Sequence, residues 1–205
     1  IVFTWMERKV AGFIQSRYGP MRTGRIHGWA QPIADMLKIL AKEDIIPAEA
    51  DKPLFIFAPL LVLLGSLLAW AAVPWAPGFV AADLDLGLFY IFAASSMVII
   101  GILMAGWASN NKWALYGAAR GAAQMVSYEI PLALACIPVV MYTGSLNTQD
   151  IVIAQQGGVM NWFIFRNPFL FVAFFMYFIA SIAETNRGPF DMPETESELV
   201  AGYHT

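Results

Sequence analysis

Long apolar segments without charge constrain this chain more than any other feature. The twenty residues from Leu54 to Val73 contain no charged side chain, and a second uncharged segment runs from Leu86 to Ala108. As an α-helix, such a segment spans roughly 30 Å, the thickness of the hydrocarbon core of a bilayer. Of the 205 residues, 59% are hydrophobic and 13% are charged, roughly half the charged share of a soluble domain. The sequence therefore predicts an all-α, polytopic transmembrane protein.

Two further segments bring the predicted membrane helices to four. One runs from about Ala114 to Tyr142 and contains Arg120 and Glu129; the other, about Pro168 to Ala183, is short unless neighbouring residues extend it. Ile1–Met6 is typical of the end of an earlier helix. The chain begins without a methionine and stops without a closing element, so we expect it to be a fragment of a longer protein.

The predicted organisation is a single integral membrane domain covering residues 1–205. Its parts are the end of a first helix (1–8), a loop with an interfacial helix (9–52), four transmembrane helices (53–187) and an acidic loop (188–205).

Basic residues are divided unequally between the predicted loops. Most lie between Arg8 and Lys52, none lies between Ala76 and Asp85, and Arg166 is the only one between Thr143 and Asn167. Loops rich in Lys and Arg remain on the cytoplasmic side of a membrane. The sequence therefore predicts that the long basic loop and the acidic C-terminal loop face the cytoplasm, or the matrix if the protein is mitochondrial.

An amphipathic helix is predicted within the basic loop, from about Trp29 to Lys42. Its apolar residues recur at spacings of three and four, namely Trp29, Ile33, Met36, Leu37 and Leu40. A helix of this kind can lie in the membrane interface or pack on neighbouring protein. The pattern favours neither alternative.

Glu129 is the first candidate for chemistry. It lies about midway along the third predicted span, within the stretch SYEIP, where an ionised side chain costs a few kcal/mol. Two interpretations are open: a structural carboxylate hydrogen-bonded between helices, or a proton-handling group beside a water-containing cavity, which we favour. Pro131 can kink the helix here and free a carbonyl group close to Glu129.

Five acidic residues follow the last apolar segment within a short distance: Glu184, Asp191, Glu194, Glu196 and Glu198. Asp191 and Glu194 match the start of a helix with acids in its first turn. Such a start needs only one or two acids. Repulsion among all five would raise some of their pKa values, which suits proton exchange. Local reasoning leaves both explanations open.

No other pattern indicates catalysis or metal binding. His27 and His204 are far apart and lack metal-ligand spacing, and Cys136 is the only cysteine, so we expect neither a metal site nor an iron–sulfur cluster in this chain. Motifs for nucleotides or for a catalytic nucleophile are missing from the sequence. The net charge of −3 and the lack of a basic, aromatic patch argue against nucleic-acid binding.

Several longer motifs carry a resemblance to a known family. They are WMERKV near the start, GWAQPIADMLKILAKEDIIPAEAD from Gly28 to Asp51, GWASN from Gly106, AQMVSYE from Ala123 to Glu129, and ETNRGPFD to ESELVAGYHT from Glu184 to Thr205. Through them the chain resembles the subunit 1 family of respiratory complex I, called NuoH in bacteria. The stretch KEDIIPAEAD is more similar to bacterial than to mitochondrial members of the family. The resemblance extends over essentially the whole chain.

The resemblance implies a fold of eight transmembrane helices, of which this chain would hold the end of the first and helices two to five. It implies a membrane subunit of proton-pumping NADH:quinone oxidoreductase, a translocase with no redox centre in this chain. Quinone would be the substrate, and flavin mononucleotide and iron–sulfur clusters would lie in partner subunits. Further partners would be the hydrophilic quinone-reducing arm, the antiporter-like membrane subunits and lipids of a bacterial inner (plasma) membrane.

The resemblance also implies roles for individual residues. Proton coupling would involve the acids Glu129, Glu184, Asp191, Glu194, Glu196 and Glu198. The quinone chamber would be lined by Arg8, Arg17, Trp29, Asp35, Lys38, Arg187 and Phe190.

Three other functions stay open at this level. The nearest is the equivalent subunit of a membrane-bound hydrogenase or of a dehydrogenase linked to ferredoxin or a deazaflavin coenzyme. A stand-alone ion or solute transporter would also carry acids inside the membrane. A passive anchor would use Glu196 and Glu198 only to dock the hydrophilic arm.

Overall fold

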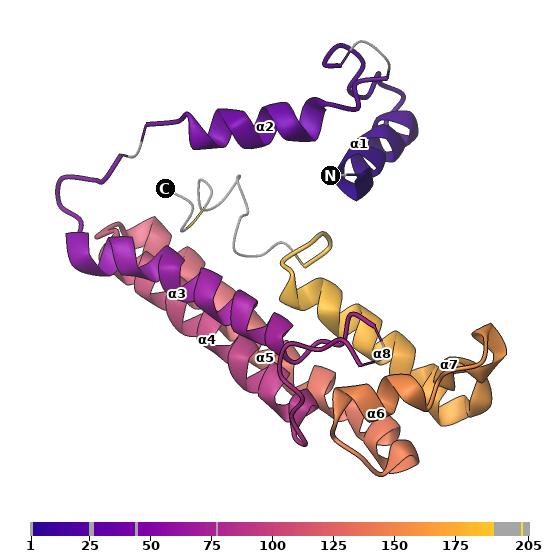
Figure 1. Ribbon diagram of the computed structural model, residues 1–205. Coiled ribbons are helices and arrows are strands. Elements are labelled where there is room, and N and C mark those ends of the chain that lie inside the picture. The colour runs from indigo at the N-terminus through magenta and orange to yellow at the C-terminus, as the bar shows by residue number, and fades with distance from the viewer. Residues whose placement is uncertain (1, 25–26, 44, 77, 191–201, 203–205) are drawn as a thin grey trace. The chain divides into compact units, whose positions relative to one another are not determined.

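The computed structural model describes residues 2–24, 27–43, 45–76, 78–190 and 202. Over these residues every regular element is helical (Figure 1), which confirms the all-α prediction. The chain divides into two compact units, Ile1–Ile45 and Ile46–Thr205.

The first unit contains α1 (Val2–Ile14) and α2 (Gln31–Leu40). Helix α1 extends past the predicted end at residue 8. Charged residues such as Arg8 interrupt the apolar segment there, but they are good helix formers, so the helix continues. Helix α2 has ten residues and is shorter than the predicted Trp29–Lys42 segment. Pro32 lies in its first turn, where a residue without an N–H is tolerated, so the helix begins close to it.

Hydrogen bonds and one glycine organise the loop between α1 and α2. The Trp5 indole N–H donates to the His27 carbonyl at 3.0 Å, and the Thr23 hydroxyl donates to Gln31 at 2.7 Å. Gly28 has φ +65°, and a Cβ atom there would lie 2.4 Å from the Pro20 carbonyl oxygen. Only glycine fits such a position without strain.

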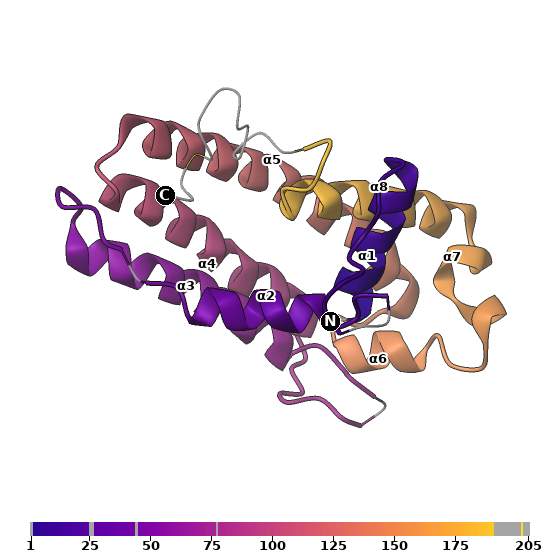
Figure 2. The ribbon, with the colours of Figure 1, turned by 90° about the horizontal axis from the view of Figure 1, so that it is seen from above.

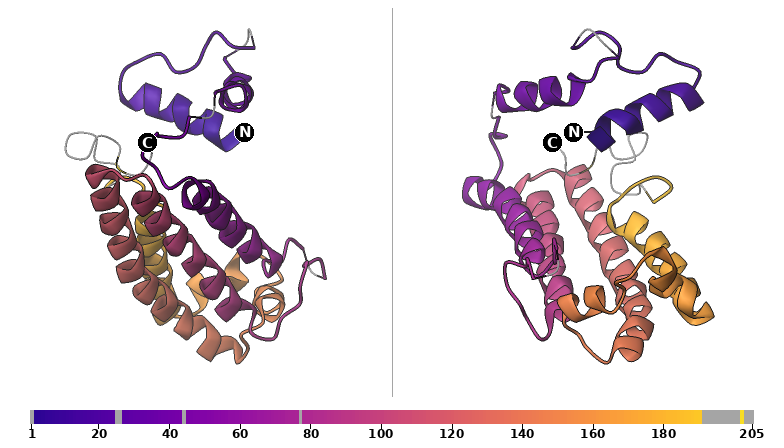
Figure 3. Two further views of the ribbon diagram at one scale, coloured as in Figure 1. Left: turned by 90° about the vertical axis from the view of Figure 1, so that its left-hand side faces the viewer. Right: turned by 45° about the vertical axis from the view of Figure 1, so that its right-hand side comes forward.

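The second unit is a row of long apolar helices: α3 (Lys52–Ala71), α4 (Gly87–Ala108), α5 (Lys112–Thr143) and α8 (Pro168–Glu184). Each packs on the next, so that α4 lies between α3 and α5, and α8 packs on α5 (Figure 2, Figure 3). The bounds agree with the predicted apolar segments to within two residues. Helix α5 continues through Pro131 and Pro138.

Small residues allow α4 and α5 to approach closely. A Cβ atom at Gly106 of α4 would lie 2.2 Å from the Ala118 Cβ atom of α5. Ala118, Gly117 and Gly121 are all buried. The small residues at the start of α5 therefore form a packing face, as their spacing predicts.

Short elements connect α5 to α8: α6 (Thr148–Ile153), a 3-10 turn (Val159–Asn161) and α7 (Phe163–Arg166). The Thr148 hydroxyl donates to the carbonyl of Ala72 at 2.7 Å, and the Asn147 amide donates to Asp83 at 2.8 Å. These bonds connect the loop after α3 with the loop after α5.

Three of the helices, α3, α4 and α5, are long and apolar enough to cross a membrane. Helix α8 is apolar but has 17 residues, so the residues on either side of the predicted segment do not lengthen it by a turn. The Asn167 side chain caps its start by accepting the Phe169 N–H, and the helix ends at Glu184. At 1.5 Å per residue α8 is about 25 Å long, somewhat short of the roughly 30 Å hydrocarbon core.

Candidate functional site: two carboxylates in one cavity

Glu129 and Glu184 line the same cavity in the second unit. The cavity has a volume of about 190 Å³ and is lined by Ser95, Val98, Ile99, Met125, Glu129, Glu184 and Thr185. Three elements therefore build it: the middle of α4, the middle of α5 and the C-terminal end of α8. The structure brings together two acids that lie far apart in the sequence.

The surroundings of the two carboxylates are largely apolar. Both side chains are half-buried, and Val98, Ile99 and Met125 are their neighbours in the cavity wall. Two negative charges in such a space repel one another strongly because little water screens them. The charge of one carboxylate therefore depends on the charge of the other.

The turn after α8 is held against α5 by Gln124, a residue of the AQMVSYE motif for which the sequence predicted no role. Gln124 of α5 is buried, and its side-chain amide donates to the Ala183 carbonyl (2.7 Å), the Phe190 carbonyl (2.8 Å) and the Asn186 side chain (3.1 Å). The signal that could have revealed it is an amide group inside a membrane span, where polar side chains commonly hydrogen-bond to a neighbouring helix.

Two predicted chamber residues, Arg187 and Phe190, lie in this turn. The Phe190 ring packs edge-on against Tyr128 of α5, with 5.3 Å between centroids. Arg187 is exposed. The acids Asp191, Glu194, Glu196 and Glu198 lie outside the described residues, and their roles stay predictions.

The other chamber residues, Arg8, Arg17, Trp29, Asp35 and Lys38, all belong to the first unit. Arg8 of α1 and Asp35 of α2 form an ion pair. Hydrogen bonds from Arg8, and then from Gln31 at 3.0 Å, lower the pKa of the Asp35 carboxyl below its usual value. The pair therefore links the two helices of this unit.

The remaining three residues of that set do not join the pair through a hydrogen bond. Arg17 donates to Gln15 at 2.6 Å, and the Trp29 indole donates to the Gly24 carbonyl at 3.1 Å. Lys38 is exposed in the last turn of α2, where its positive charge further lowers the Asp35 pKa.

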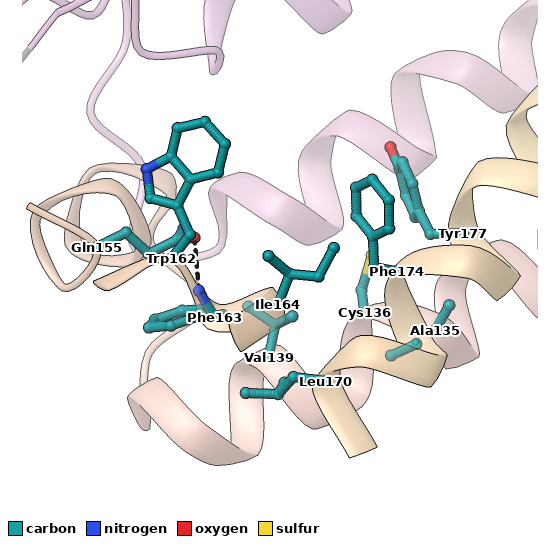
Figure 4. Close-up of a pocket in the computed structure, with 11 residues that line it drawn as sticks. Ala135, Cys136, Val139, Gln155, Trp162, Phe163, Ile164, Leu170, Phe174 and Tyr177 are labelled. Carbon is teal, nitrogen blue, oxygen red and sulfur yellow. Dashed lines mark hydrogen bonds between the residues drawn. The ribbon is translucent and has the colours of Figure 1, made fainter. Parts of the chain in front are cut away.

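A second cavity, of about 250 Å³, lies between α5, α7 and α8 (Figure 4). Figure 4 shows aromatic and aliphatic side chains around it, with the Phe163 N–H donating to Gln155 at 3.4 Å. Cys136 contributes to this wall. The cavity contains no carboxylate among its lining residues. Within the described ranges, no group of three His, Cys, Asp or Glu side chains could hold a metal ion.

Apolar helices of membrane-spanning length, packed around a cavity that holds two acids, define a polytopic membrane protein with an ionisable site inside its helix bundle. The family can be named from sequence comparison. The whole chain, residues 1–205, matches the family model described as NADH dehydrogenase. The chain therefore belongs to the NADH dehydrogenase family of membrane subunits, as the resemblance predicted.

Individual relatives support the same family. The chain is 54% identical over 201 residues to the H subunit of NADH-quinone oxidoreductase from Chlorobaculum parvum, covering 97% of this chain and 56% of the relative. Its identity to the corresponding NADH-quinone oxidoreductase protein of a Geobacillus species is 53% over 198 residues, covering 97% of this chain and 58% of the relative. The chain thus spans about half the length of the curated relatives it matches. Their names do not favour the hydrogenase alternative.

Proposed function

We propose that this chain is part of the membrane subunit of a proton-pumping NADH:quinone oxidoreductase that forms the quinone-access chamber and couples quinone reduction to proton translocation. Family membership and the names of the relatives support the enzyme complex. The observation that carries the coupling role is the cavity shared by Glu129 and Glu184.

In this proposal the two carboxylates handle protons as one unit. A proton that arrives on one of them relieves the repulsion between the two charges, and its departure restores that repulsion. The charge of the pair would then respond to any change of charge near the quinone. Asp191, Glu194, Glu196 and Glu198 would extend the set of acids toward the quinone chamber.

The first unit would contribute to the quinone entrance. Met36, Leu37 and Leu40 of α2 are all exposed, which suits a helix that lies in the membrane interface. Arg8, Asp35 and the other predicted chamber residues of this unit would border the quinone on its way in. The resemblance also counts Arg187 and Phe190 among the residues of the quinone chamber.

The partners follow from the same proposal. The hydrophilic arm would carry the flavin mononucleotide and the iron–sulfur clusters and reduce the quinone, and the antiporter-like subunits would translocate protons. The membrane would be a bacterial inner membrane. The excess of Lys and Arg between Arg8 and Lys52 supports a cytoplasmic position for the basic loop and for the acidic loop after α8.

The test is Glu129→Gln in the intact complex with the full-length subunit. The amide keeps the shape of the side chain but can neither bind nor release the proton. We expect normal assembly and a fall of at least about tenfold in quinone-linked proton pumping, less than the roughly hundredfold that loss of a general acid–base group typically costs a reaction. Pumping in membrane vesicles and subunit content in a native gel are the measurements. Normal coupled activity would contradict the proton role.

A further inference from the structure

We propose that Gln124 is a positioning residue that fastens the turn after α8 to α5 and thereby keeps Glu184 in the cavity with Glu129. The consequence for turnover rests on the proposed function. The positioning itself rests only on the geometry of the second unit.

Three acceptors surround one amide group. The Gln124 Nε2 atom lies 2.7 Å from the Ala183 carbonyl oxygen, 2.8 Å from the Phe190 carbonyl oxygen and 3.1 Å from the Asn186 Oδ1 atom. The two carbonyl oxygens can only accept, so they fix the orientation of the Gln124 amide, with its NH₂ group toward the turn. The side chain is 8% exposed, and hydrogen bonds in such a place have little competition from water.

A second residue of α5 holds the same turn. Tyr128 lies four positions after Gln124, and residues at this spacing share one face of a helix. Its ring packs against the Phe190 ring, so Phe190 is held by its carbonyl group from Gln124 and by its side chain from Tyr128. This face of α5 therefore fixes both ends of the segment from Ala183 to Phe190.

The fastened segment includes the candidate proton-coupling acid. Ala183, whose carbonyl accepts from Gln124, directly precedes Glu184 and is fully buried. Gln124 lies one position before Met125 and five before Glu129, and both of these line the carboxylate cavity. Without the amide, the end of α8 would lose these hydrogen bonds to the helix that carries Glu129. Glu184 would then no longer be held at a fixed position relative to its partner.

Gln124→Glu is the most informative change. It preserves size and shape, but an oxygen replaces the NH₂ group, so the side chain donates no hydrogen bond when ionised and at most one when protonated. Gln124→Asn is the milder variant, because it retains an amide donor on a side chain one methylene shorter. The matched control is Gln149→Glu in α6, where the side-chain oxygen accepts the Gly78 N–H at 3.1 Å. A carboxylate retains that bond.

The first measurement is hydrogen–deuterium exchange in the intact complex with the full-length subunit. Asn186 and Phe190 donate their N–H groups to the carbonyls of Ala183 (3.3 Å) and Arg187 (2.8 Å) within the turn. We expect a peptide covering this turn to exchange about tenfold faster in Gln124→Glu, less so in Gln124→Asn, and unchanged in Gln149→Glu. Unchanged exchange in assembled Gln124→Glu complex would overturn the inference. If that variant fails to assemble, unchanged exchange in Gln124→Asn would do the same.

The second measurement follows the acid itself. The infrared bands of the Glu184 carboxyl group, protonated or ionised, assigned by their loss in Glu184→Gln, should shift in Gln124→Glu and stay in place in Gln149→Glu. Stationary bands in assembled complex would overturn the inference, since a contact with only a structural role leaves the carboxyl group unchanged. Failure of the proposed function would look different. Normal pumping by Glu129→Gln would contradict the proposed role of Glu129 in proton coupling. It would not affect the expected exchange of the turn or the expected shift of the Glu184 bands.

Discussion

The two units of this chain place paired ionisable groups in opposite settings. Arg8 and Asp35 of the first unit are side chains of opposite charge, linked by an ion pair in an exposed setting. Glu129 and Glu184 of the second unit have the same charge and share a largely apolar cavity. Water screens the first pair and makes it worth little. The second pair is poorly screened, so a single proton changes its energy considerably. The two pairs thus differ in the sign of their charges and in the polarity of their surroundings.

Replacing an acid by its amide should therefore have very different effects in the two units. The largest loss of proton pumping is expected at Glu184. Glu184→Gln removes one of the two ionisable groups of the cavity, so we expect quinone-linked proton pumping to fall at least about tenfold. The measurement is acidification of the vesicle interior driven by NADH. The comparison is Asp35→Asn, also an acid-to-amide change, which we expect to retain assembly and to lower pumping less, because water screens the ion pair that it removes. Pumping near wild-type level in Glu184→Gln would break the contrast.

A smaller effect, on the stability of the first unit rather than on pumping, is expected when Asp35 is protonated. Its pKa is lowered in the folded protein, chiefly by the hydrogen bond from Arg8, so the ion pair contributes stability above the ordinary carboxyl pKa of about 4. This contribution is lost as the pH falls through the lowered pKa. We expect acidification below about pH 4 to weaken the α1–α2 contact in the wild type and to have less effect in Asp35→Asn. Protease sensitivity of the first unit against pH measures this, and identical profiles would contradict it.

Much of the fold follows from the sequence because apolar segments of helical length have few alternatives in a membrane. The bounds of α3, α4, α5 and α8 were predicted closely for that reason. The predicted bounds of α1 and α2 differ from the observed ones, and in both helices the reason is a single residue. Arg8 ended an apolar segment without ending α1, and Pro32 set the start of α2 regardless of the apolar spacing around Trp29.

The candidate site was only partly predictable. Glu129 is recognisable alone because an acid inside an apolar span is costly, and Glu184 because it ends one. Their shared cavity depends on how α4, α5 and α8 pack, which no local pattern contains. Gln124 was missed because it follows a run of small residues whose spacing indicates helix packing, and its three acceptors lie in a turn far away in the sequence.

The most direct test of the central claim, that Glu129 and Glu184 act as one proton-handling unit, is a double-mutant cycle on pumping. Glu129→Gln, Glu184→Gln and the double variant are compared in the intact complex with the full-length subunit. If the pair acts as one unit, the double variant loses about as much pumping as either single variant, because effects within such a unit are not additive. Losses that multiply, as for two independent groups, would contradict the claim.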